Sequence, residues 1–230
     1  MVKAGHAGRR SPRAEAELKN VVIPPFGVAG ILRLPESATG LVIFAHGSGS
    51  SRLSPRNNAV ADALTSHGLA TLLFDLLTEE EEVDRRNVFD IGLLADRLVC
   101  AIEWAGGQPA LKALPLGLFG ASTGAAAALV AAAHLEERVA AIVSRGGRPD
   151  LAGDALERVR APTLLIVGGA DNEVVELNER ALAKLRSPKK LQIIPGAGHL
   201  FSETGTLEAV IDHAATWFGT YLRSSPRRVS

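Results

Sequence analysis

Several features that would place this chain in a particular class are missing from its sequence. It contains one cysteine, Cys100, so no disulfide can form within the chain, and a reducing, cytoplasmic environment is expected. No apolar run approaches the length that crosses a membrane. Lys and Arg total 25, as do Asp and Glu. Without an excess of either charge, neither nucleic acid nor a membrane surface is an expected partner.

The patterns of metal and nucleotide sites are also missing. The histidine, cysteine and aspartate residues do not cluster at the spacing of metal ligands. The glycine-rich segment HGSGSS lacks the lysine of a phosphate-binding loop, and GASTG lacks the glycine spacing of a dinucleotide site. We therefore expect neither a metal nor another cofactor.

The chain is long enough for one large domain, and no linker divides it. Residues 1–17 are polar and predict a disordered tail, and SSPRRVS predicts a frayed end over 224–230. A single domain is expected between them, over 18–223.

The hydrophobic pattern changes at Gly40. Before it, ELKNVVIP and FGVAGILRLP predict two antiparallel strands joined through a turn. After it, unbroken apolar runs alternate with expected helices near 54–66, 88–105, 123–134, 174–185 and 207–221. The runs are LVIFAHG, LATLLFD, PLGLFG, VAAIVSRGG, PTLLIVGG and LQIIPGAGH. Such runs are typical of strands covered on both faces, so the pattern predicts a doubly wound, mostly parallel α/β sheet with an antiparallel leading edge.

Ligands of such sheets bind beyond the carboxyl ends of the strands. One strand end carries a specific signal, because Gly120-Ala121-Ser122-Thr123-Gly124 lies between an expected strand and an alanine-rich helix. A serine flanked by glycines in that place is typical of a nucleophile elbow. The N–H groups at the start of the helix would face the charge that develops during acyl transfer. We interpret Ser122 as a nucleophile.

A serine hydroxyl needs a base, and the base needs a third group that fixes its orientation. His199 follows the last expected strand, with the apolar Leu200 and Phe201 beside it as anchors. Asp171 follows the preceding strand. We interpret His199 as the base and Asp171 as the orienting acid.

Rivals exist for both roles. His46 also follows a strand, but it precedes the nucleophile and suits a loop-shaping role next to Gly47. Asp150 and Glu173 are alternative acids. Asp171 is favoured because it is short and closest to its strand end.

The negative charge of the intermediate requires two N–H donors. Thr123, the residue after the nucleophile, supplies the first in this interpretation. Ser48, in the loop after the third strand, supplies the second, and Gly47 and Gly49 let the backbone approach the substrate closely.

The chain resembles the α/β-hydrolases, and more narrowly the dienelactone hydrolase-like group, from about Leu18 to Tyr221. The resemblance rests on LVIFAHGSGSSRLSPRN, GLFGASTGAAAAL, TLLIVGGADNEVVELN and IPGAGHLF, which occur in the family's order. The chain order Ser, Asp, His is also that of this family. Dienelactone hydrolase itself uses a cysteine nucleophile, and the matching position here is Ser122. A serine implies ordinary ester chemistry, so the dienelactone activity is not carried over.

Other segments bear on the substrate. Between Ser144 and Pro162 there is room for a few helical turns and not for a cap domain, so an open site is expected. Arg145 is a candidate substrate contact, since a guanidinium there could hold a carboxylate; a salt bridge to the run Glu79–Glu82 is the equal alternative. Arg52 and Arg56 are expected to brace the loop at Ser48.

The sequence thus predicts a serine hydrolase that cleaves small carboxylic esters, lactones or thioesters through an acyl-enzyme on Ser122. A peptidase or amidase using the same residues is the alternative enzyme, and a non-catalytic binding protein of this fold is the alternative class. The expected partner is a small acyl substrate, and a homodimer is left open.

Overall fold

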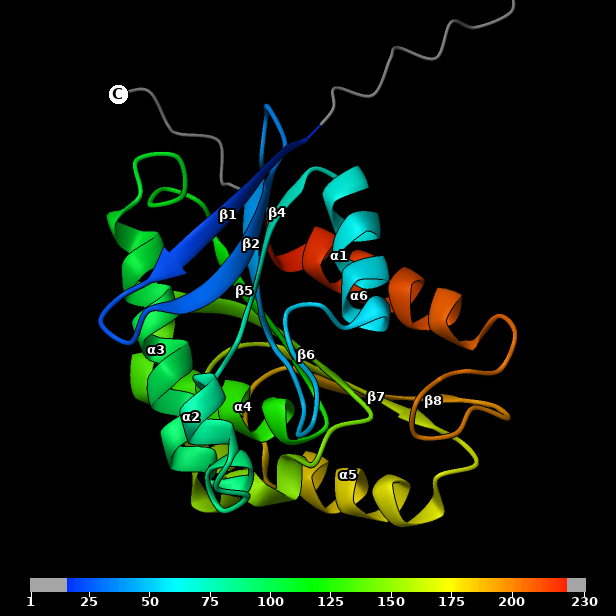
Figure 1. Cartoon of the computed structure of the whole chain (residues 1–230). Helices are drawn as coiled ribbons and strands as arrows, with labels where there is room; N and C mark the ends of the chain where they lie inside the picture. The colour runs from blue at the N-terminus through cyan, green and yellow to red at the C-terminus, as the bar shows by residue number, and fades with distance from the viewer. Residues whose placement is uncertain (1–15, 223–230) are drawn as a thin grey trace, which may run out of the picture.

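A computed structural model describes residues 16–222, so the predicted tails lie outside the described residues apart from positions 16–17. Within this range the chain forms an eight-stranded sheet (Figure 1). The strands are β1 (Glu17–Ile23), β2 (Val28–Leu34), β3 (Gly40–Ala45), β4 (Leu69–Phe74), β5 (Leu116–Ala121), β6 (Val139–Arg145), β7 (Thr163–Gly168) and β8 (Lys189–Ile194).

The strand order across the sheet is β1-β2-β4-β3-β5-β6-β7-β8. β1 pairs antiparallel with β2, and β2 pairs antiparallel with β4. Each remaining neighbouring pair, from β4–β3 to β7–β8, is parallel. The predicted fold class, a mostly parallel doubly wound sheet with an antiparallel leading edge, is therefore confirmed.

Helices cover both faces of this sheet (Figure 1). α1 (Pro55–Ser66) and α6 (Thr206–Tyr221) pack on one face. α3 (Ile91–Gly107), α4 (Thr123–Leu135) and α5 (Asn172–Lys184) pack on the other. The short elements are α2 (Glu79–Glu82) and the 3₁₀ segments Asn87–Phe89, Glu136–Arg138 and Pro149–Arg158.

The apolar runs form the centre of the molecule. Every residue of β3, β4 and β7 is buried, as expected for strands covered on both faces. Small side chains let α4 pack closely on the sheet, because its buried face consists mainly of alanines.

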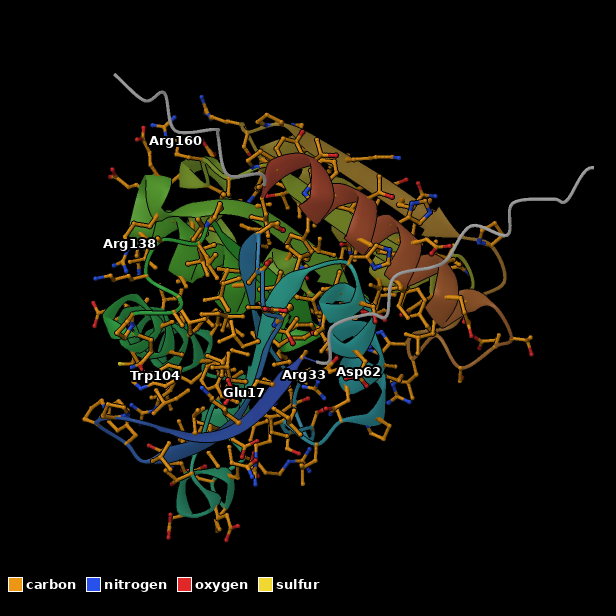
Figure 2. The ribbon with its side chains drawn as sticks, turned by 90° about the horizontal axis from the view of Figure 1, so that it is seen from above. Glu17, Arg33, Asp62, Trp104, Arg138 and Arg160 are labelled. Carbon is orange, nitrogen blue, oxygen red and sulfur yellow. The ribbon has the colours of Figure 1, made fainter. Side chains whose placement is uncertain are left out.

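Polar contacts fix α1 against the antiparallel edge. Arg33 of β2 donates to Asp62 at 2.7 Å and to Asn58 at 2.6 Å, both in α1, and Arg33 and Asp62 lie side by side in Figure 2. α1 begins as predicted, with the Ser54 hydroxyl accepting from the Asn57 N–H and Pro55 at the first helical position.

One helix starts later than the sequence predicts, and one short helix was not predicted. α3 starts at Ile91 instead of residue 88, because the Asp90 carboxylate caps it by accepting from the Leu93 N–H. The run Glu79–Glu82, for which no helix was predicted, forms α2; it begins with a capping box between Thr78 and Glu81, and none of its residues is buried.

The connection from β6 to β7 contains Pro149–Arg158 as its ordered segment, so no cap domain is inserted there. Among the described residues, no helix combines the length and apolar character needed to cross a membrane.

Candidate active site

Ser122 occupies a sharp turn between β5 and α4. Its backbone has φ 51° and ψ −122°, a conformation that side chains rarely adopt. Glycines on both sides make the turn sterically feasible. A Cβ on Gly120 would lie 2.4 Å from the Ala125 Cα, and one on Gly124 would lie 2.2 Å from the Ala45 oxygen. The local geometry is that of a nucleophile elbow.

The backbone of Ser122 is tied to the loop after β6. Its N–H donates to the Arg145 carbonyl at 3.3 Å, and its own carbonyl accepts from the Arg148 N–H at 3.1 Å. Both bonds hold the turn in its strained conformation, and they place Arg145 beside the serine.

His199 and Asp171 form a hydrogen-bonded pair. The distance from His199 Nδ1 to Asp171 Oδ2 is 2.7 Å. An ionised carboxylate only accepts, so Nδ1 carries the proton in neutral His199 and Nε2 remains an acceptor. Asp171 is positioned directly after β7, at the start of α5, and its side chain makes no capping bond there. The alternative acid Asp150 is instead paired with Arg148, at 2.9 and 2.8 Å.

The loop that carries His199 is anchored from one side. Phe201 is buried in the core, as expected, whereas Leu200 is half exposed and does not anchor the loop. Gly146 faces the loop, since a Cβ there would lie 3.0 Å from the His199 carbonyl oxygen.

Ser122 and His199 line the same pocket, which has a volume of about 800 Å³. The pocket is open, with Leu53 and Leu200 exposed at its wall. Its remaining lining residues are Gly47–Ser51, Ser54, Pro55, Arg56, Glu82, Ala121, Arg145 and Gly146.

The two expected oxyanion donors lie next to each other. A Cβ on Gly47 would be 2.8 Å from the Ser122 Cβ, so the loop after β3 runs directly against the nucleophile. The Ser48 N–H donates to Thr123 Oγ1 at 3.1 Å. The Thr123 N–H is at the first position of α4, where helix geometry leaves it without an intrahelical acceptor. Gly49 has φ 66°, which suits glycine.

His46 holds this loop in place, in the loop-shaping role expected for it. Nδ1 lies 3.0 Å from the Gly47 carbonyl, and Nε2 accepts from the Leu76 N–H at 3.0 Å. Burial lowers the pKa of His46, and the weaker effects of the Gly47 carbonyl, Asp75 and Glu82 oppose that shift. The imidazole is therefore neutral and occupied at both nitrogens.

The arginines near this loop play different parts. Arg52 braces the loop, since its N–H and guanidinium both contact Asp75. Arg56 was expected to do the same, but it lines the pocket, and its Nε atom is buried without a hydrogen-bond partner among the described residues. Arg145 also lines the pocket and does not pair with the glutamate run; Glu81 of that run pairs with Arg97. Sequence reasoning missed Arg56 at this position, because nothing in the sequence indicates where a helical arginine points.

The residues that the structure describes contain no group of three or more His, Cys, Asp or Glu side chains suited to a metal ion.

Comparison with known proteins identifies the fold independently. The family model of an alpha/beta hydrolase domain matches residues 38–218. A crystal structure of a dienelactone hydrolase from Anabaena variabilis is 55% identical, with a TM-score of 0.87, over 92% of this chain and 100% of that one. Est1E from Butyrivibrio proteoclasticus has a TM-score of 0.74 over 88% of this chain and 98% of that one; at 16% identity it shows the fold alone.

Two relatives come from Mycobacterium tuberculosis. A putative phosphoribosyl transferase is 58% identical over 211 residues, which are 92% of this chain and 48% of the relative. An uncharacterized protein is 33% identical over 66% of this chain and 64% of its own length. The chain thus spans about half the length of the first of these relatives.

Proposed function

The chain belongs to the α/β-hydrolase family and has a dienelactone hydrolase-like fold, and on that basis we propose that it is a serine hydrolase of small carboxylic esters, lactones or thioesters. One observation carries the proposal: the strained Ser122 shares a pocket with the His199 ring, whose Nδ1 is held by Asp171. A serine on an elbow, beside a histidine oriented by a carboxylate, is the arrangement that acyl transfer requires.

In the first half of the reaction, Ser122 Oγ attacks the substrate carbonyl carbon and His199 Nε2 takes the hydroxyl proton. The C=O electrons move to the oxygen, and the N–H groups of Thr123 and Ser48 stabilise that negative charge. When the oxyanion collapses, the bond to the leaving alcohol or thiol breaks. His199 then returns the proton to the leaving group, and an acyl-enzyme remains on Ser122.

In the second half, His199 takes a proton from water, and the hydroxide attacks the acyl carbon. Collapse of this second intermediate releases the carboxylic acid and restores the Ser122 hydroxyl. Asp171 stays ionised throughout and stabilises the imidazolium that forms at each step. The open pocket favours small or protruding acyl groups.

We do not propose phosphoribosyl transfer, although one relative is named for it. This chain aligns with about half of that relative. The serine and the histidine that line the pocket, together with the carboxylate bonded to that histidine, are the groups used in acyl transfer.

A fluorophosphonate probe tests the proposal, because it reacts covalently with activated serines. We expect the wild-type protein to be labelled and Ser122→Ala to remain unlabelled. Ser50→Ala is the matched control, since Ser50 lines the same pocket, and it should be labelled like the wild type. Labelling that persists in Ser122→Ala, or none in the wild type, would refute the mechanism and leave a binding protein. Comparing p-nitrophenyl acetate with a p-nitroanilide separates an esterase from an amidase.

A further inference from the structure

Arg145 is a buried cation without a partner. It is 8% exposed, and its Nη1 atom is buried without a hydrogen-bond acceptor. Its guanidinium forms no ion pair within residues 16–222. Burying a charge without compensation is unfavourable, so arginines in proteins are normally paired at such a position. The placement calls for an acceptor that is not part of the described chain.

A second arginine faces the same pocket. Arg56 lies in the first turn of α1, and its Nε atom is also buried without a partner. Burial and, to a smaller extent, the positive charge of Arg56 together lower the pKa of Arg145 to about 10. At neutral pH both guanidinium groups are charged, so two like charges lie close together at one wall of the pocket.

The carboxylates around the site do not neutralise this pair. Asp75 is taken by Arg52, Asp150 by Arg148 and Asp171 by His199. Glu82 lines the pocket, but among the described residues no ion pair joins it to either arginine. The first turn of α1 contains no acidic residue, so the positive end of the helix dipole adds to the field.

The number and type of donors indicate the ligand. One guanidinium group can donate to both oxygens of a carboxylate, which would leave the other arginine unpaired. A phosphoryl group carries close to two negative charges at pH 7 and offers three acceptor oxygens, enough for two guanidinium groups.

We propose that Arg145 and Arg56 form an anion-binding subsite for a phosphoryl group. This inference rests on the proposed function, since it implies that the ester cleaved at Ser122 is a small phosphorylated ester. The subsite adjoins the nucleophile, because the Arg145 carbonyl accepts the Ser122 N–H and both side chains line one pocket. The phosphoryl group thus lies within a few bonds of the scissile carbonyl. It positions the substrate and takes no part in bond breaking.

Isothermal titration calorimetry with inorganic phosphate tests the subsite without relying on activity. We expect one phosphate to bind per chain in the wild type and in Ser122→Ala. Arg145→Met and Arg56→Met should each weaken binding at least about tenfold, as for the loss of a charge-assisted hydrogen bond. Arg180→Met, which removes an exposed arginine outside the pocket, should leave the affinity unchanged.

Two outcomes overturn the proposal: phosphate does not bind, or the arginine variants bind it as tightly as the wild type. Acetate at matched ionic strength is the control for carboxylates, and equal binding of acetate also overturns the phosphoryl assignment. Circular dichroism verifies that each variant is folded. Arg145 and Arg56 lie on different elements, so the two variants are separate tests of the same subsite.

An activity measurement then connects the subsite to the reaction. We expect kcat/KM for acetylglycerol 3-phosphate to exceed that for acetylglycerol at least about tenfold, and Arg145→Met to abolish this ratio. If the wild type has the same kcat/KM for both esters, the substrate assignment is wrong. If the protein neither cleaves the ester nor reacts with the fluorophosphonate, the proposed function is wrong. The phosphate titration then still shows whether the subsite binds phosphate.

Discussion

The backbone N–H of Ser48 donates a hydrogen bond to the Thr123 hydroxyl at 3.1 Å, across 75 residues of sequence. The bond joins the loop after β3 to the first residue of α4, the two segments that carry the proposed oxyanion donors. The substrate oxygen therefore has to share the Ser48 N–H with the Thr123 hydroxyl or displace that hydroxyl.

Thr123→Val is expected to lower kcat/KM for a neutral ester about tenfold. The substitution removes the acceptor that positions the Ser48 N–H and costs about 1–2 kcal/mol of stability, because it leaves a donor unpaired. Thr123→Ser keeps the hydroxyl and should behave like the wild type. Steady-state kinetics and chemical denaturation measure the two effects, and a fully active Thr123→Val would show that the hydroxyl does not position the donor.

Asp171→Asn is expected to reduce kcat by about three to four orders of magnitude. An amide in place of the carboxylate favours the wrong tautomer of His199 and no longer stabilises the imidazolium. Asp150→Asn is the matched control, because Asp150 is paired with Arg148 and does not contact His199. It should retain most of the activity in an assay with p-nitrophenyl acetate. Similar losses in both variants would remove the special role of Asp171.

Gly124→Ala is expected to destabilise the protein by more than about 3 kcal/mol, or to prevent folding. Its new Cβ would lie 2.2 Å from the Ala45 oxygen and 2.5 Å from the His46 oxygen, and neither backbone atom can move freely. Gly219→Ala is the control, since a Cβ there meets nothing within 4 Å. In the helix α6 it should stabilise the protein by about 0.5–1 kcal/mol. Urea denaturation compares the two variants.

Arg145→Met is expected to raise the free energy of unfolding by about 1–3 kcal/mol in phosphate-free buffer at pH 7. The wild-type guanidinium is charged at this pH, because its pKa is about 10, and it is buried without a partner. Phosphate should reverse the order, since it binds the folded wild type and stabilises it. Melting curves with and without phosphate provide the measurement, and a variant less stable than the wild type in both buffers contradicts the expectation.

Acid should destabilise the wild-type protein partly through His46. Burial lowers the pKa of this histidine in the folded protein below its ordinary value of 6.5, so near and below that pH the unfolded chain binds more protons than the folded protein. Stability then falls as the pH drops below 6.5. Between pH 7.5 and 5.5, the wild type should lose more stability than His46→Gln, measured by urea denaturation. Equal losses would mean that His46 does not titrate with folding.

The sequence predicted the sheet well because most of its strands are unbroken apolar runs. In an α/β domain such runs are stable in the central sheet, where helices cover both faces. It also placed Ser122, Asp171 and His199 at strand ends, which the parallel sheet gathers at one edge. The pairing of His199 with Asp171 instead of Asp150 could be favoured from spacing, but the competing pair with Arg148 was not foreseeable.

The sequence could not show how side chains on different elements meet. The direction of Arg56 depends on how α1 packs beside the pocket, and the burial of Arg145 depends on the loops that close over β6. The run Glu79–Glu82 forms a helix because Thr78 and Glu81 cap it. That signal was present in the sequence as a threonine followed three residues later by a glutamate.

The backbone of Ser122 has a consequence for how this position can evolve. A residue with φ 51° and ψ −122° pays a conformational cost of about 1–3 kcal/mol that glycine would largely avoid. Mutation to glycine would therefore strengthen the fold while removing the hydroxyl. Selection for stability alone favours glycine at this position, so the proposed catalytic role supplies the reason to keep a serine here. Under that proposal, a descendant with glycine at position 122 would be more stable and inactive.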